Sequence, residues 1–391
     1  MGRGPADRRI GAFRRPGGAV GLRNHLLVLG INGLALRASE RIVACLAGSV
    51  CAATPSGRGL IEPDLSLHLD QLVGLGTNPN VGAVLVVGVD EKTTRIVAER
   101  IRPTGKPVAT VSFAETHEDA LAVLDLGLRR AASLARAASE ARREAVSIAD
   151  LVLGVECGHS DATSGTGANP VVGAAVDLLV DQGATVMVGE TVEWLGAEHL
   201  LLRRARDCAI GQHIMDAVNR REARAAASGA SLTGNNPGEE NIRGGLSTIE
   251  EKSLGAVAKS GTRAIDGVVS LAERPPGAGL YLMDGPAFSP DSMTGFTAAG
   301  AQLILFTTGP GNSFASAIAP TIKITARADT AERLREQIDF DASPVIAGTE
   351  DVQEAAARLL DTVLDVADGT LTFGEILGEG LETFTRVRGS L

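Results

Sequence analysis

The amino-acid sequence predicts an α/β protein built from doubly wound, mostly parallel sheets in two domains. Short apolar runs alternate along the chain with longer amphipathic stretches, which is the pattern of repeated strand–helix units. The run at residues 81–89 is almost wholly apolar, as expected of a parallel strand that is covered on both faces. A chain of 391 residues is long enough for two or three domains.

Composition divides the chain into four regions. Residues 1–15 contain five arginines among Gly and Pro, and we expect them to form a disordered basic tail. Residues 16–115 should form an N-terminal α/β domain. Its strands and helices are expected at 26–30, 38–46, 49–53, 64–74, 81–89, 94–102 and 107–112. Residues 116–146 are rich in Ala, Arg and Glu and predict a helical linker with one buried apolar stripe. Residues 147–391 should form a C-terminal α/β catalytic domain.

Charge and composition argue against several classes of function. The formal net charge of −10 argues against nucleic acid as a partner. No apolar run approaches the roughly 18 residues of a membrane span, so we expect no membrane association. The four cysteines lack CxxC spacing and resemble reduced cytosolic thiols, which predicts a cytoplasmic protein. No GxGxxG follows an expected strand in the N-terminal domain, which argues against a dinucleotide.

A strand, a polar loop, a helix and a second strand follow one another after residue 150. Residues 151–155 are apolar and predict a buried strand, and residues 185–188 predict the next one. Asn169 and Pro170 have the residue types of a helix N-cap and of the first helical position. Gly183 is suited to end that helix. The segment therefore predicts a right-handed βαβ crossover.

Ionisable side chains gather in the two loops that leave these strands. The carboxyl ends of adjacent parallel strands meet at one edge of the sheet, where open α/β sheets bind ligands. The side chains there are sufficient to hold a divalent metal and still leave an acid or a base, and free N–H groups after Asn169 would suit an anion. A solvated loop with a structural cap is the alternative. The candidates are Cys157, His159, Ser160, Asp161, Ser164, Asn169, Glu190, Glu193, Glu198 and His199.

Further candidate residues lie in other segments. Arg23 and Asn24 stand at the amino end of the first expected strand, where they either bind a substrate carboxylate or form a surface turn. A Gly-rich loop at 307–312, which includes Thr308, follows a strand and is a second candidate anion cradle. Lys323 lies within an apolar strand and should reach a partner or a ligand, since lysine is rarely free in a core. Residues 229–245 are rich in Gly and Asn and form either a flexible excursion or an active-site lid.

Five stretches of the sequence carry a resemblance to a known family. They are CGHSDATSGTGANPVVG at 157–173, GETVEWLGAEHLLLRR at 189–204, GGLSTIEEKSLG at 244–255, FTTGPGN at 306–312 and PTIKI at 320–324. Together they resemble the altronate and galactarate dehydratase family, and the similarity extends over roughly residues 10–390. Members of this family are metal-dependent lyases that act on 2-hydroxy acids.

The resemblance implies a lyase that eliminates a C3 leaving group from a 2-hydroxy acid. Residues 56–58 and 64–68 resemble the branch that cleaves (2R)-3-sulfolactate to pyruvate and sulfite. The cysteines that sugar-acid dehydratases usually carry in the N-terminal half are replaced here, as at Asp90 and Glu91. This favours sulfolactate over a sugar acid. Dehydration of a sugar acid to a 2-keto-3-deoxy acid, and a non-catalytic family member, are the alternatives.

Roles for the candidate residues follow from this reaction. We expect Cys157, Glu190 and His199 to bind a divalent metal, with Fe²⁺ preferred and Mn²⁺ or Mg²⁺ as alternatives. Asp161 or Glu198 is the expected base. The expected substrate contacts are Arg23, Asn24, Ser160, Ser164, Asn169, Thr308 and Lys323. The family's small domain is missing ahead of this region, so the resemblance implies a separate small subunit beside a small acidic substrate. We also expect a homo-oligomer.

Overall fold

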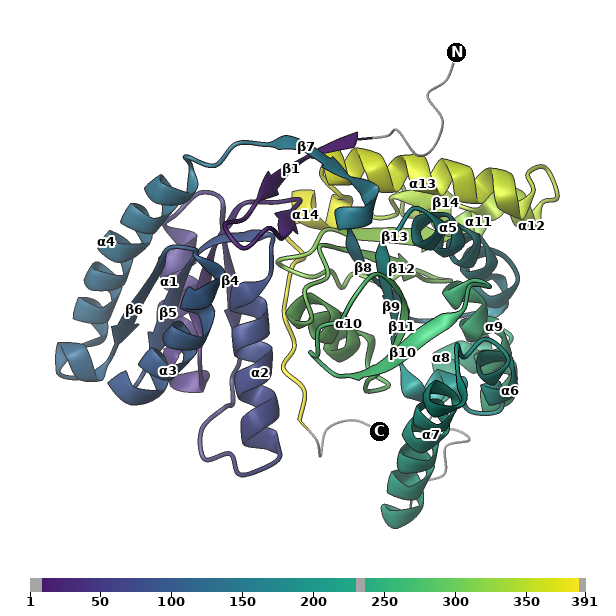
Figure 1. The fold of residues 1–391 in the computed structure, drawn as a ribbon, viewed down its shortest axis with the longest axis horizontal. Helices are drawn as coiled ribbons and strands as arrows, with labels where there is room; N and C mark the ends of the chain where they lie inside the picture. The colour runs from purple at the N-terminus through teal and green to yellow at the C-terminus, as the bar shows by residue number, and fades with distance from the viewer. Residues whose placement is uncertain (1–8, 230–235, 387–391) are drawn as a thin grey trace.

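The computed structural model describes residues 9–229 and 236–386 (Figure 1). It contains a four-stranded parallel sheet, a seven-stranded parallel sheet and a small antiparallel sheet, with helices packed around the two larger ones. The expected α/β class is confirmed. The division into two domains stays a prediction, and the two larger sheets with their helices are called here the N-terminal unit and the C-terminal unit. Within the described residues, every helix is too short or too polar to cross a lipid bilayer.

The N-terminal unit is built on four parallel strands in the order β4-β3-β5-β6. The strands are β3 (His25–Gly30), β4 (Ser49–Ala53), β5 (Val81–Gly88) and β6 (Val108–Ser112). The helices are α1 (Gly33–Ala44), α2 (Asp64–Thr77), α3 (Glu91–Ile101) and α4 (Ala120–Ala138).

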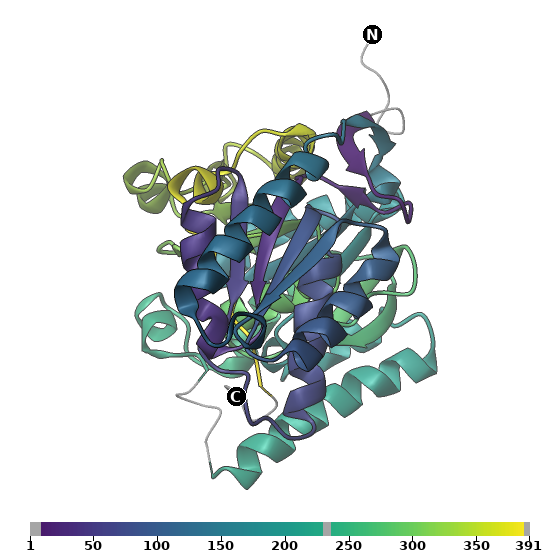
Figure 2. The ribbon, with the colours of Figure 1, turned by 90° about the vertical axis from the view of Figure 1, so that its left-hand side faces the viewer.

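Both faces of this sheet are covered. Leu27 and Leu29 of β3 share an apolar cluster with Leu72 of α2, whereas Leu26 and Val28 point the other way and share a cluster with residues of α1 and α4. Figure 2 shows the helices on the two sides of these strands. Every residue of β5 is buried, which explains its continuous apolar sequence.

The C-terminal unit is built on seven parallel strands in the order β10-β11-β9-β8-β12-β13-β14. The strands are β8 (Val152–Cys157), β9 (Thr185–Val188), β10 (Ile265–Ser270), β11 (Gly279–Asp284), β12 (Leu303–Thr307), β13 (Thr321–Thr325) and β14 (Phe340–Asp341). Two apolar clusters use opposite faces of this sheet, since Val186 and Val188 of β9 belong to one and Met187 to the other.

Ten helices accompany these strands in the described part of the C-terminal unit. They are α5 (Asn169–Asp181), α6 (Glu198–Leu202), α7 (Cys208–Ala227), α8 (Glu239–Arg243), α9 (Ile249–Val257), α10 (Ser289–Ala298), α11 (Ala328–Arg333), α12 (Ser343–Ile346), α13 (Val352–Asp368) and α14 (Phe373–Leu377). Helices α5 and α13 pack together, while Phe296 of α10 packs with Met187 on the other face.

The prediction of a disordered tail over residues 1–15 was wrong from Arg9 onward, where the chain forms a strand. Residues 1–8 lie outside the described residues, but β1 (Arg9–Arg14) pairs antiparallel with β2 (Val20–Gly21) and with β7 (Glu144–Ser147). Alternate residues of β1, namely Ile10 and Ala12, are buried in the core of the C-terminal unit. The prediction overlooked this alternation because arginines dominate the composition.

The segment at 116–146 also differs from the expected helical linker. Helix α4 buries Val123, Ala131 and Leu134 against the four-stranded sheet, so it is one of that sheet's covering helices. The chain then crosses between the units as β7, a strand rather than a helix. The apolar stripe was correctly expected, but sequence periodicity does not say which surface a stripe packs against.

Two buried asparagines join the units. The side-chain amide of Asn80 donates hydrogen bonds to the carbonyls of Gln302 (2.8 Å) and Ile318 (2.9 Å). The amide of Asn78 donates to the carbonyls of Thr297 (2.7 Å) and Ala301 (2.8 Å). Because a buried amide is costly without partners, these contacts favour one relative position of the two units.

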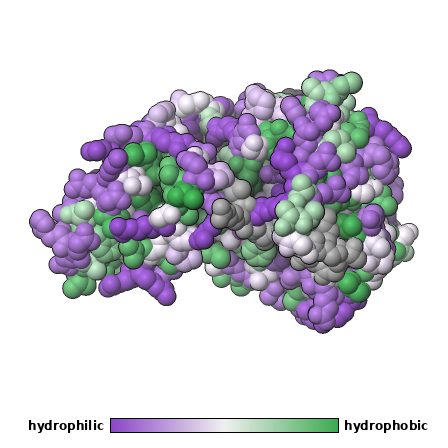
Figure 3. Space-filling view, turned by 90° about the horizontal axis from the view of Figure 1, so that it is seen from below, coloured by the Kyte–Doolittle hydropathy of each residue, from purple (hydrophilic) through white to green (hydrophobic). Residues whose placement is uncertain are grey.

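Figure 3 shows hydrophilic side chains over most of one face, with hydrophobic ones gathered on the N-terminal unit at the left.

The C-terminal segment runs between α2 and α10 and contains a buried acid, Glu382 (Figure 1). One oxygen accepts hydrogen bonds from the Ser316 hydroxyl and from the Ala317 N–H, and the other has no partner among the described residues. Burial raises the pKa of Glu382 from 4.5 to about 7, although these hydrogen bonds oppose the shift. The folded protein therefore retains this proton at pH values where the unfolded chain has lost it.

We predict that Glu382→Gln removes a pH-dependent loss of stability. A carboxyl whose pKa is raised on folding contributes full stability below pH 4.5, and that contribution is lost as the pH rises through about 7. Relative to the variant, the wild-type free energy of unfolding should fall by about 3 kcal/mol between pH 4.5 and about pH 8. Urea denaturation across this range measures the difference, and parallel curves for the two proteins would contradict the prediction.

Candidate active site

Three segments of the C-terminal unit meet at one edge of the seven-stranded sheet. Strands β8 and β9 are adjacent and parallel, so Cys157 at the end of β8 lies beside the loop that follows β9. That loop turns sharply at Glu190, whose φ of 65° lies in the left-handed region that most side chains avoid. A 3₁₀ turn, Thr191–Trp194, follows and carries Glu193. Helix α9 packs against this turn from the other side.

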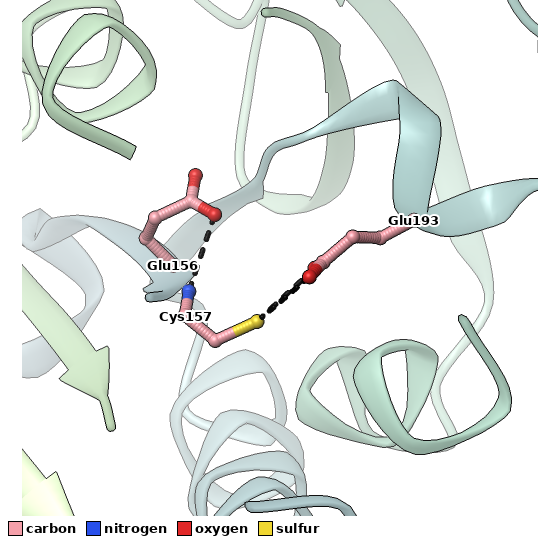
Figure 4. Close-up of side chains that lie close together, drawn as sticks. All are labelled: Glu156, Cys157 and Glu193. Atoms are coloured by element: carbon pink, nitrogen blue, oxygen red, sulfur yellow. Dashed lines mark hydrogen bonds between the residues drawn. The ribbon is translucent and has the colours of Figure 1, made fainter. Parts of the chain in front are cut away.

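Glu156, Cys157 and Glu193 form a compact buried group (Figure 4). The Cys157 sulfur lies 3.1 and 3.3 Å from the two carboxylate oxygens of Glu193. The Cys157 N–H donates to Glu156 Oε1 at 3.1 Å. One ligand atom from each of the three residues lies within 4.8 Å of the others. The structure therefore contains a thiol and two carboxyls that could hold a metal ion.

The side chains of two lysines contact this group: Lys252 lies on α9, and Lys259 lies in the turn after it. Lys259 forms an ion pair with Glu193, and its Nζ lies 3.2 Å from the Cys157 sulfur. Lys252 Nζ lies 3.2 Å from Glu193 Oε1 and 3.7 Å from Glu190 Oε1. The six residues with these buried side chains are called the buried cluster: Glu156, Cys157, Glu190, Glu193, Lys252 and Lys259.

Burial and mutual charge set the protonation of the buried cluster. Burial raises the pKa of Glu156, of Glu190 and of the Cys157 thiol, and the neighbouring acids add to each shift. Burial also acts to raise the pKa of Glu193, but the ammoniums of Lys259 and Lys252 outweigh it and lower that pKa. Both lysines keep a raised pKa because the acids around them outweigh the effect of burial. The two ammoniums outnumber the one acid whose pKa is lowered, so the buried cluster is suited to an anion.

A cavity of about 480 Å³ opens beside the buried cluster. Cys157, Glu190 and Lys252 line it, while Glu193 and Lys259 contact these residues from behind. This volume is in the range of small-molecule sites. The remaining polar wall residues are His159, Asn236, Glu240, Asn241, Ser289 and Asn312. This space is called the cluster cavity.

The donor set is chemically suited to a divalent cation. Thiolate and carboxylate ligands bind borderline ions such as Fe²⁺ and Zn²⁺. Glu156 Oε2 is buried and has no hydrogen-bond partner in the part of the chain that the structure describes, so it could act as a ligand. The ammonium of Lys259 contacts both Cys157 and Glu193, so a cation at these donors competes with Lys259.

The structure brings Cys157 and Glu190 together, but it does not bring Glu198 or His199 to them. Both lie on α6, and His199 is exposed. Glu198 accepts a hydrogen bond from the Gly196 N–H, and neither side chain lines the cluster cavity. The chain turns outward at Gly196, where φ is +80° and an added Cβ would collide with Glu250. The second loop therefore contributes Glu193 rather than His199.

Asp161 begins a helix instead of facing the cluster cavity as a base. Its Oδ1 accepts hydrogen bonds from the N–H groups of Thr163 (2.9 Å) and Ser164 (3.1 Å), which is N-cap geometry. A π-helical turn, Ser164–Ala168, then continues directly into α5. The prediction that Asn169 is the N-cap was wrong, because helical turns already precede it. Asn169 is therefore not at the start of the helix, and the anion site expected on the N–H groups after it does not form.

The other expected substrate contacts mainly stabilise the fold. Asn169 donates to the Gly255 carbonyl, and Lys323 is paired with Glu379. Arg23 forms an ion pair with Glu375, and Asn24 donates to the Ala138 carbonyl. The Ser164 hydroxyl contacts Asp161. Ser160 and Thr308 keep hydroxyls that are buried and have no partner among the described residues. Of these seven residues, none lines the cluster cavity.

Sequence reasoning left Glu156 and the two lysines out of the site, and it counted Glu193 among the loop carboxylates without giving it a role. Lys252 and Lys259 are seven residues apart, a spacing that puts two side chains on one face of a helix. Glu190 and Glu193 are three residues apart, which places them on one side of a helical turn. Both spacings are visible in the sequence, but neither says that the shared face points inward.

Comparison with known proteins agrees with the sequence resemblance. Residues 148–387 match the family described as D-galactarate/altronate dehydratase, C-terminal. Residues 12–139 match the second domain of D-galactarate dehydratase/altronate hydrolase. The chain belongs to the D-galactarate/altronate dehydratase family. All six residues of the buried cluster lie within the first match.

Three relatives illustrate the range of activities in the family. The (2R)-sulfolactate sulfo-lyase subunit beta of Chromohalobacter salexigens is 38% identical over 96% of this chain and 96% of its own length. The altronate dehydratase of Escherichia coli is 29% identical over 95% of this chain and 76% of its own length. The L-threo-forming galactarate dehydratase of Escherichia coli is 33% identical over 76% of this chain and 55% of its own length. By name these relatives are lyases and dehydratases.

We predict that Lys259→Met destabilises the protein by about 3 kcal/mol, because it removes the closest partner of a buried carboxylate. The double variant Lys259→Met/Glu193→Gln should recover much of that loss, since it leaves no unpaired charge at this contact. Denaturant unfolding of the wild type, both single variants and the double variant gives the coupling energy. Strictly additive effects of the two substitutions would show that the pair is not energetically coupled.

Proposed function

We propose that this protein is a lyase that eliminates sulfite from (2R)-3-sulfolactate to give pyruvate. The supporting comparison is the sulfo-lyase subunit, whose similarity extends over nearly the full length of both chains. The structural observation that carries the proposal is the cluster cavity, where a lysine and a carboxyl face a space of small-molecule size. The substrate is a small dianion, which suits the Lys252 ammonium at the wall of the cluster cavity.

The reaction requires a base, a contact for the substrate carboxylate and a path for sulfite. Glu190 removes the proton from C2, since its carboxyl lines the cluster cavity. Lys252 stabilises the negative charge that then develops on the substrate carboxylate. The C3–S bond breaks, and its electron pair leaves with sulfite. The resulting enol becomes pyruvate when its hydroxyl proton moves to C3.

A divalent cation, with Fe²⁺ preferred over Mn²⁺ or Mg²⁺, would be held by Glu156, Cys157 and Glu193. When bound, such an ion withdraws charge from a coordinated carboxylate and hydroxyl and so makes the C2 proton more acidic. Lys259, which contacts two of these three donors, holds them in place when the ion is absent. Of the expected ligands Cys157, Glu190 and His199, this proposal keeps only Cys157.

We also propose a separate small subunit, since the sulfo-lyase relative is named as a beta subunit. A homo-oligomer and a cytoplasmic location stay predictions. Dehydration of a sugar acid is the second candidate function, because the galactarate dehydratase relative is 33% identical over 76% of this chain. The two functions share the C2 proton abstraction and differ in the group that leaves C3.

We predict that the chain, purified with its small partner and Fe²⁺, releases sulfite and pyruvate in equal amounts from (2R)-3-sulfolactate. Sulfite needs little acid assistance to leave, whereas hydroxide requires a general acid. Altronate and galactarate serve as parallel substrates, with the 2-keto-3-deoxy acid as the readout. Turnover of a sugar acid alone would assign the second function, and no turnover of any substrate would indicate a non-catalytic member.

We predict that Glu190→Gln lowers kcat by about 10²- to 10⁴-fold, since the amide cannot accept the C2 proton. Substrate binding should be kept, because Lys252 is unchanged. Glu198→Gln and His199→Ala on the following helix, α6, are matched controls, and both should retain kcat because neither side chain lines the cluster cavity. Steady-state kinetics with unfolding curves for each variant provide the measurement. A normal kcat in Glu190→Gln would remove Glu190 as the base.

A further inference from the structure

A second and larger cavity lies between the two units. Its volume is about 730 Å³, and it is called the interunit cavity. Its walls come from α2, from the segment after α3 and from the loop after β10. Among the described residues, no lining residue is shared with the cluster cavity. The reaction proposed above makes no use of this space.

Two buried cations in its wall bind only neutral groups. Arg15 donates to the carbonyls of Pro79 (2.7 Å) and Arg23 (2.8 Å) and to the Asn24 side-chain oxygen (2.7 Å). Lys106 donates to two carbonyls at the end of α2. Hydrogen bonds of this kind satisfy the N–H groups but leave the positive charge uncompensated.

A third cation, Arg274, is exposed and reaches the interunit cavity from the C-terminal unit. Within residues 9–229 and 236–386, no hydrogen bond or ion pair of its guanidinium is found. Burial lowers the pKa of Lys106, and the charges of Arg15 and Arg274 lower it further. The positive charge of Lys106 is therefore disfavoured beside Arg15 and Arg274, and a bound anion would stabilise it.

The acidic side chains in the wall do not offset this charge. Asp70 is paired with Arg100, a fourth basic residue of the lining. Glu273 is exposed, accepts a hydrogen bond from the Ser270 N–H, and forms no ion pair with the three cations among the described residues. An anion from solution is thus the missing counter-charge.

We propose that the interunit cavity binds a small organic anion that bears a phosphate or a carboxylate group. The charged group would lie between Lys106 and Arg274, because the Arg274 guanidinium is free to form a bidentate contact. The apolar part would lie on Val73, Leu271 and Ala298, which line the same space. Since Lys106 and Arg274 belong to different units, the ligand would also hold the units together.

Isothermal titration of the full-length chain with 3-phosphoglycerate, adenosine monophosphate and inorganic phosphate tests the proposal. At least one organic phosphate should bind saturably with a Kd below about 1 mM. Arg274→Gln should weaken that binding by about tenfold or more, which is the effect of losing one charge-assisted contact. Arg274→Lys should restore part of the affinity. Arg95→Gln, an exposed arginine outside the lining, is the matched control and should bind as the wild type does.

The effect of the two substitutions on binding shows whether the anion binds in the interunit cavity. Saturable binding that Arg274→Gln weakens and Arg95→Gln does not weaken supports the interunit cavity. Binding that both variants retain places the anion elsewhere and overturns the proposal, as does the absence of binding by all three probes up to about 10 mM. Arg274→Gln should leave the unfolding temperature without ligand unchanged, because no hydrogen bond or ion pair of the Arg274 guanidinium is found among the described residues. A fold defect in that variant is thus detected separately from lost binding.

Discussion

The buried ion pair between Lys259 and Glu193 is the interaction on which the candidate site depends. It joins the turn after α9 to the turn after β9, and both side chains contact Cys157 at the end of β8. Removing two charges from water costs several kcal/mol for each ion unless they are paired and hydrogen-bonded. The three segments therefore pack together at little cost only when neither charge is left without a partner. The position of Lys252 at the wall of the cluster cavity follows from the same closure.

This pairing also sets the chemistry of the cluster cavity. Glu193 contacts both lysines, but only Lys252 also lines the cluster cavity, where it can attract an anion beside Glu190. Burial and the neighbouring Glu193 raise the pKa of Glu190, while the Lys252 ammonium opposes that shift. The Cys157 thiol is neutral in this environment, since burial and the nearby acids raise its pKa. A bound divalent cation would change this balance by taking the place of the Lys259 ammonium at Cys157 and Glu193.

The sequence correctly predicted those features of the fold that depend on local burial and on parallel strand order. The continuous apolar run of β5 and the convergence of loops after β8 and β9 follow from strand period and parallel topology. The cap of the helix that leads into α5 was misplaced, because Asp161 and Asn169 are both good capping residues and only the first accepts the N–H bonds. Lys259 was missed because it approaches Cys157 from about a hundred residues away, and apolar periodicity does not show which polar residues turn inward.

The central claim is that an anionic substrate binds over the buried cluster, with Lys252 and Glu190 at its carboxylate end. A crystal structure of the Glu190→Gln variant soaked with (2R)-3-sulfolactate tests it most directly, since the variant should bind the substrate without consuming it. The account predicts density for the substrate in the cluster cavity, with its carboxylate in hydrogen-bond contact with Lys252. Density for the substrate at another place, with the Cys157–Lys252 wall free of ligand, would contradict it.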